Sequence, residues 1–181
     1  MNGPLKSMLR EIRLGQCGMR LRPRSAPRGG YPYGLEALEF LRIEKGHVVI
    51  GGEADGRTTA HVLRLEKMQR KAGGFIGASA LERPALNAVE RKQLVGLESL
   101  GGDIPEGAML LAGSGTAVEG HVTAAAMRVV EGGSIALALL AGGRARSGEV
   151  LRASSPTRGQ VVQVRVIEPH FYDPAGARYR D

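Results

Sequence analysis

The stretch VVQVRVI, residues 161–167, decides the fold class of this chain. Its valines at 162, 164 and 166 alternate with the polar residues Gln163 and Arg165, which is the period-two pattern of a strand with one buried face. Five earlier segments have a similar character and are separated by glycine-rich or polar turns: 93–99, 108–112, 120–124, 134–140 and 148–153. Six short strands in about ninety residues favour a closed antiparallel barrel, because closure removes exposed sheet edges.

The chain before the barrel is predicted to contain little regular structure. Apolar residues form one broad face of LEALEFLRIEK, residues 35–45, which predicts a helix that ends at Gly46. We also predict a short strand at 47–50, a short helical or extended stretch at 62–71, and a helical turn between 75 and 84. One helix and one strand cannot bury a core of their own. The fold class is therefore α+β, with the tail of a larger domain at 31–91 and a complete barrel domain at 92–181.

Most of the basic charge lies at the amino terminus. The chain has 25 Lys and Arg residues against 18 Asp and Glu residues, a net charge of +7. Residues 1–30 carry seven of the bases and one acid, Glu11, among several prolines and glycines. We interpret residues 1–30 as a disordered basic leader. The alternatives are a phosphate-binding arm or a transit peptide, but neither aromatic interleaving nor serine enrichment supports them, so we expect no nucleic-acid partner.

Several classes of protein are excluded by what the sequence lacks. Cys17 is the single cysteine, so no internal disulfide forms, and no apolar run approaches the ~20 residues of a membrane span. These features predict a cytoplasmic protein without a membrane segment. The chain has neither a P-loop nor a GxGxxG turn, and its four histidines are widely separated. Accordingly, no nucleotide, dinucleotide or metal site is predicted.

Three polar residues are candidates for chemistry on residue type alone. Ser134 follows two glycines, as in the turn of a serine nucleophile, but the segment enters a predicted strand and not a helix. We therefore interpret Ser134 as a turn residue. Glu53 and Asp55 are a candidate pair of carboxylates for acid–base chemistry. The alternative is that both acids, which lie beside glycines and Arg57, only pin or solvate a loop.

Longer stretches of the sequence resemble a known family. In order and spacing, residues 31–181 are similar to the last part of the sarcosine oxidase alpha subunit. They are more loosely similar to the ends of dimethylglycine dehydrogenases and of the glycine-cleavage T-protein, an aminomethyltransferase. The stretches that carry this resemblance are YGLEALEFLRIEKG (33–46), HVVIGGEADGRTT (47–59), GGFIGASAL (73–81), RKQLVGL (91–97), SIALALL (134–140) and PHFYDPAGARYR (169–180).

The resemblance implies a fold, a cofactor and partners. Residues 31–91 are expected to be the tail of an aminomethyltransferase-like folate domain, followed by a six-stranded antiparallel β-barrel domain. The implied cofactor is tetrahydrofolate, which receives the one-carbon unit released from sarcosine. Flavin and NAD belong to other parts of such an assembly, so this chain is expected to have a site for neither. The implied partners are the other sarcosine oxidase subunits or the missing part of the alpha chain.

The family's main functional groups have no counterpart here. Its catalytic aspartate and its Gly-Tyr-Thr-Gly-Glu run lie upstream of the segment at 34–46, and Leu38 stands where the T-protein has a folate-binding arginine. We therefore assign no catalytic residue. The candidates for contact with folate are Tyr33, Glu36, Arg42, Glu53 and Asp55.

Three functional hypotheses remain open at this point. The first is a carboxyl-terminal fragment of a sarcosine oxidase alpha-like protein, which is not active alone. The second is a short aminomethyltransferase-like protein that still binds tetrahydrofolate. The third is a non-enzymatic interaction module with a basic arm.

Overall fold

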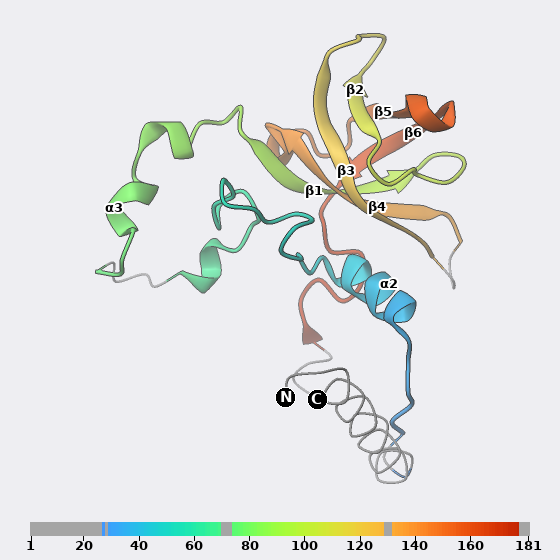
Figure 1. The fold of residues 1–181 in the computed structure, drawn as a ribbon, viewed down its shortest axis with the longest axis horizontal. Coiled ribbons are helices and arrows are strands. Elements are labelled where there is room, and N and C mark those ends of the chain that lie inside the picture. The colour runs from blue at the N-terminus through green and yellow to red at the C-terminus, as the bar shows by residue number, and fades with distance from the viewer. Residues whose placement is uncertain (1–26, 28, 70–73, 129–131, 178–181) are drawn as a thin grey trace, which may run out of the picture. The chain divides into compact units, whose positions relative to one another are not determined.

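The computed structural model describes residues 27, 29–69, 74–128 and 132–177 (Figure 1). The chain divides into two compact units, and the boundary lies between Leu38 and Glu39 inside helix α2 (Leu35–Lys45). Within the described ranges, the six strands and the short helical elements that follow α2 belong to the second unit, which we call the barrel unit. Almost all of the predicted leader at 1–30 lies outside the described residues. None of the helices in the described ranges is long and apolar enough to cross a membrane.

Six antiparallel strands close into a barrel, which confirms the prediction from the sequence. They are β1 (Lys92–Ser99), β2 (Met109–Ala112), β3 (Val118–Met127), β4 (Ser134–Ala141), β5 (Val150–Ser155) and β6 (Gln160–Ile167). Their spatial order is β1-β4-β3-β2-β5-β6, and pairing of β6 with β1 completes the closure. Strand β3 is longer than the predicted segment at 120–124, and its register with β4 shifts between Val122 and Ala124.

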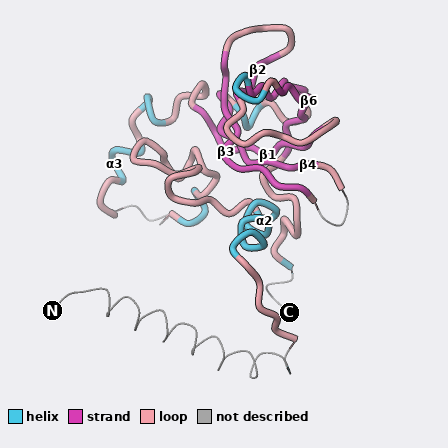
Figure 2. The backbone as a smooth tube through the Cα atoms, turned by 45° about the vertical axis from the view of Figure 1, so that its right-hand side comes forward, coloured by secondary structure: helices cyan, strands magenta, loops and turns pink. Residues whose placement is uncertain are grey.

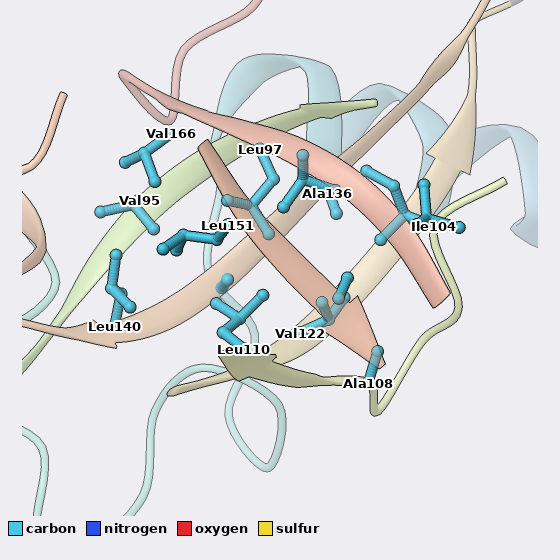
Figure 3. Close-up of a cluster of buried hydrophobic side chains, with 14 residues drawn as sticks. Val95, Leu97, Ile104, Ala108, Leu110, Val122, Ala136, Leu140, Leu151 and Val166 are labelled. Carbon is cyan, nitrogen blue, oxygen red and sulfur yellow. The ribbon is translucent and has the colours of Figure 1, made fainter. Parts of the chain in front are cut away.

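The barrel interior is filled by aliphatic side chains (Figure 3). The valines at 162, 164 and 166 are buried there, while the alternating residues Val161, Gln163 and Arg165 are exposed, as the period-two pattern predicted. Branched side chains from all six strands pack in this core, including Val95, Leu110, Val122, Leu140, Leu151 and Val164. Burial of these side chains is the main stabilising term of the fold.

A second apolar cluster lies outside the barrel wall. Ile43 of α2 is fully buried against Leu94 of β1 and Ile135 and Leu137 of β4. Leu94 precedes the interior residue Val95 on the same strand, and successive strand residues point to opposite faces. Strands β1 and β4 are therefore apolar on both faces, because the carboxyl-terminal half of α2 covers their outer surface.

The residues between α2 and β1 are mostly loop (Figure 2). They contain three short elements: the 3₁₀ turns η2 (Glu66–Met68) and η3 (Pro84–Leu86), and the helical turn α3 (Ala78–Leu81), which was predicted. The predicted strand at 47–50 is wrong. The carbonyl oxygen of Val49 accepts hydrogen bonds from the amides of Gly52 and Ala54, so this segment turns back on itself and makes only one isolated bridge, Ile50 to Ala54.

Candidate functional site

Two of the predicted site residues, Arg42 and Glu53, form a buried ion pair. Nη1 of Arg42 donates to Oε2 of Glu53 at 3.0 Å, and the Glu53 side chain is completely buried. The same oxygen accepts the amide of Val49 at 2.9 Å. Arg42 also contacts the carboxylate of Glu39 and donates to the carbonyl oxygen of His47 at 3.3 Å. We call Arg42, Glu53 and the Val49 amide the α2 clamp, because they hold the loop at 47–54 against the helix.

The pKa values in the clamp agree with a charged pair. Burial raises the pKa of the Glu53 carboxyl, but hydrogen bonds from the Val49 amide, the Thr123 hydroxyl and Arg42 outweigh it, so the net pKa is lowered. Burial likewise lowers the pKa of Arg42, and the carboxylates of Glu39 and Glu53 more than compensate. Glu53 Oε1 is buried and has no hydrogen-bond partner within the described residues. The Thr123 hydroxyl, which also contributes to the lowered pKa of Glu53, donates to the Leu137 carbonyl oxygen at 3.0 Å.

The end of α2 is also held by the carboxyl-terminal segment of the chain. The amides of Phe171 and Tyr172 donate to the carbonyl oxygen of Glu44 at 2.9 and 3.0 Å. Nζ of Lys45 lies 3.0 Å from the Asp173 carboxylate. Gly46, which ends the helix with φ +72°, is packed so closely that a Cβ there would collide with the carbonyl oxygen of Pro169. The helix end and the segment after β6 therefore form one packed structure.

Asp55 does not join the α2 clamp. Its Oδ1 accepts the Arg57 amide at 2.8 Å and the Thr58 hydroxyl at 2.6 Å, while its own amide donates to Thr58 Oγ1 at 2.9 Å. These bonds lower the pKa of Asp55, with the Thr58 hydroxyl as the largest cause. Glu53 is buried in an ion pair and Asp55 is more than half exposed in a turn. In this structure, the carboxylates of Glu53 and Asp55 both stabilise loop conformations.

Tyr33 and Glu36 lie in the amino-terminal unit and are exposed to solvent. Their roles in a folate site stay predictions. Ser134, interpreted as a turn residue, is buried, and its hydroxyl accepts the amide of Ile104 at 3.1 Å. In the described part of the chain, no group of three or more His, Cys, Asp or Glu side chains is arranged to hold a metal ion.

Cavities lined by described residues open at two places on the barrel unit. The first, of about 420 Å³, is bordered by the turn residues Asp55, Arg57 and Thr58, by Arg91 and Lys92 at the start of β1, and by His121 on β3. We call it the basic cavity. The second, of about 430 Å³, lies at the end of α2 beside His47, Met68 and His170. Sequence reasoning missed Arg91, Lys92 and His121, because the Arg91-Lys92 pair is distant in the chain from His121 and the three residues match no motif.

The sequence of the barrel matches a known family. Residues 92–173 fit the family model of the glycine cleavage T-protein C-terminal barrel domain. These residues belong to that barrel family. The similarity of the chain to known proteins extends beyond the T-protein barrel into the residues that precede it. Sarcosine oxidase subunit alpha of Rhizobium meliloti (strain 1021) is 39% identical over 158 residues, which are 83% of this chain and 16% of that protein.

Aminomethyltransferases are more distant relatives. That of Moorella thermoacetica is 32% identical over 145 residues, 80% of this chain and 38% of the relative. A crystal structure of glycine cleavage system aminomethyltransferase T from Bartonella henselae shares the fold with a TM-score of 0.66 at 23% identity, over 76% of this chain and 38% of that one. The chain is thus homologous to sarcosine oxidase subunit alpha and to aminomethyltransferases, and it spans well under half of their length.

Proposed function

We propose that this chain is the carboxyl-terminal part of the folate-binding unit of a sarcosine oxidase alpha-like protein, which passes a one-carbon group from sarcosine to tetrahydrofolate. One observation carries the proposal. The similarity to sarcosine oxidase subunit alpha covers 83% of the chain, whereas the barrel match is confined to residues 92–173. The shared sequence therefore includes residues ahead of the barrel, beyond what a shared barrel alone requires.

The isolated chain is expected to be inactive. One-carbon transfer needs an acid–base group and pterin-binding groups held in one arrangement, and their loss costs several orders of magnitude in rate. The two carboxylates that were candidates for acid–base chemistry already make other interactions. Glu53 is paired with Arg42 in the α2 clamp, and Asp55 is hydrogen-bonded within its own turn. In this proposal the catalytic groups, the flavin and the NAD belong to the missing part of the alpha chain or to the other subunits.

Exposed apolar side chains beside the α2 clamp support the proposal that another part of the folate domain packs on this surface. Leu41 is 49% exposed, Val49 is 44% exposed and Ile50 is 90% exposed. All three are close in sequence to the clamp residues Arg42 and Glu53. Covering such side chains is favourable by about 25 cal/mol per Å² of apolar surface, so the missing part of a folate domain gains stability by packing there.

The test is complementation of folate binding. The chain is mixed with Rhizobium meliloti sarcosine oxidase subunit alpha shortened to lack the segment that this chain matches, and each mixture is titrated calorimetrically with 5-formyltetrahydrofolate. We expect heat of binding from the mixture and little from either partner alone. A stable complex of the two chains that does not bind 5-formyltetrahydrofolate contradicts the proposal.

The similarity to aminomethyltransferases supports a second candidate, a short tetrahydrofolate-binding protein that works without the rest of the alpha subunit. The same titration separates the two. Micromolar one-to-one binding of 5-formyltetrahydrofolate by this chain alone, lost in Glu36→Ala or Arg42→Ala, favours the second candidate. Circular dichroism of both variants tests whether the loss comes from unfolding, and Glu36→Ala is the more direct variant because Arg42 also holds the buried Glu53.

A further inference from the structure

We propose that the basic cavity binds a small anionic molecule, a carboxylate or a phosphate, through Arg57, Arg91 and Lys92. This inference does not rest on the proposed function. The residues come from two distant stretches, the turn at 55–58 and the start of β1, and the fold brings them around one cavity of about 420 Å³. A cavity of this size accommodates a small organic anion and its hydration water.

Arg91 and Lys92 of the basic cavity differ from four arginines that link segments of the barrel unit. Each of these four arginines has a carboxylate partner: Arg42, Arg64, Arg144 and Arg146. By contrast, Arg91 donates only to backbone carbonyl oxygens, to that of Arg57 at 2.8 Å and to that of Ala85 at 3.4 Å. Within the described ranges, the Lys92 side chain makes no hydrogen bond or ion pair, although its backbone belongs to the β1–β4 pairing. Two positive charges at the cavity are therefore without a compensating carboxylate.

Among the described residues that line the cavity, one is acidic, and it does not cancel this charge. Asp55 is committed to its own turn through the Arg57 amide and the Thr58 hydroxyl. Its ion pair with Arg57 is long, at 3.8 Å, and the Arg57 side chain is 95% exposed. Exposed pairs of this kind contribute little. An incoming anion can therefore contact Arg57 without first breaking a strong ion pair.

His121 borders the same cavity and lies within reach of the Lys92 charge. Its pKa is lowered by burial and, in addition, by the charge of Lys92, so the ammonium group acts on the imidazole across the cavity wall. At neutral pH the ring is uncharged and presents one donor and one acceptor nitrogen. The remaining wall is apolar, formed by the buried Val62 and by Leu139, whose Cα pairs with that of His121. This combination suits an anionic group attached to a short apolar body.

The experiment is a titration of the ¹⁵N-labelled full chain with sodium phosphate and, in parallel, with sodium butyrate, followed by NMR at constant ionic strength against sodium chloride. We expect saturable amide shifts at Thr58, Lys92 and His121 with at least one of the two anions. Comparison of the two dissociation constants identifies whether phosphate or carboxylate is preferred.

Matched variants make the test decisive. Lys92→Gln removes a cation of the basic cavity, and Lys67→Gln removes an equally exposed lysine on η2 that does not border the cavity. We expect the dissociation constant to rise at least about fivefold in Lys92→Gln and to stay unchanged in Lys67→Gln. Both variants keep the basic residues at 1–30, so non-specific binding there is the same. Shifts that do not saturate, shifts confined to residues 1–30, or equal behaviour of the two variants would overturn the proposal.

Discussion

The guanidinium of Arg42 lies 3.0 Å from the carboxylate of Glu53, whose side chain is completely buried. The two residues are eleven positions apart, one on α2 and one in the loop that follows it. The Val49 amide binds the same oxygen, so both charges of the pair are compensated while the loop folds back on the helix. A buried carboxylate is tolerated only when it is paired in this way.

Loss of Arg42 is expected to be costly. In Arg42→Met, Glu53 remains buried without its cation, and breaking a buried pair on one side typically lowers the free energy of unfolding by about 3–5 kcal/mol. Arg165→Met is the matched control, because its pair with Glu98 is half exposed and 4.0 Å long. The control is expected to lose less than about 1 kcal/mol. Urea unfolding monitored by circular dichroism measures both, and equal losses would contradict a structural role for the clamp.

Stability should depend on pH through Glu53. Its pKa in the folded protein is below the ordinary value of 4.5. The charged form therefore stabilises the fold fully above pH 4.5, and this contribution is lost as the pH falls through the lowered pKa. In Glu53→Gln the contribution is absent at every pH. The difference in unfolding free energy between the wild type and Glu53→Gln is thus expected to shrink from pH 7 toward acid pH.

The control for the pH experiment is Glu106→Gln, a change of an exposed carboxylate before β2. Its stability should follow that of the wild type across the pH range. If Glu53→Gln and wild-type protein differ by a constant amount from neutral to acid pH, Glu53 is not charged in the folded state.

Gly46 is expected to tolerate no side chain. Gly46→Ala places a Cβ at a φ of +72° and against the carbonyl oxygen of Pro169, whereas Gly51→Ala has a similar left-handed φ of +94° but open space around it. Both substitutions incur the backbone cost of about 1–2 kcal/mol. Only Gly46→Ala adds a collision with backbone that cannot move freely. Thermal unfolding should show a clearly larger loss of stability in Gly46→Ala than in Gly51→Ala. An equal loss of stability in the two variants would mean that the carboxyl-terminal segment is not packed against α2 in solution.

Salt-sensitive binding to nucleic acid, where it occurs, is expected to come from residues 1–30. These residues hold six of the seven net positive charges of the chain. Protein shortened to begin at Tyr31 should therefore lose most of its affinity for a generic oligonucleotide, and the salt dependence should become shallower because fewer counterions are released. Fluorescence anisotropy at several salt concentrations measures this. Unchanged binding by the shortened chain would place the electrostatic surface on the barrel unit.

The barrel and the helix at 35–45 could be predicted from the sequence because their patterns are local. Alternation of valine with polar residues in 161–167 corresponds directly to the buried and exposed faces of β6. The strand predicted at 47–50 failed for the opposite reason. Its apolar residues favour a strand locally. However, the Val49 amide donates to the Glu53 carboxylate, and the Val49 carbonyl oxygen accepts hydrogen bonds from the turn that follows, so neither group pairs with another strand.

The arrangement of the candidate site residues could be predicted from the sequence to a lesser extent than the barrel and the helix. Residue type suggested Glu53 and Asp55, and the family resemblance added Arg42, but only the folded chain separates the buried pair from the solvated turn residue. The cations of the basic cavity had no signal at all, because Arg57 and Lys92 are thirty-five positions apart and belong to different elements. Periodicity reports which face of one element is buried. Which charges meet is decided by how separate elements pack, and burial then selects the pairs that compensate each other.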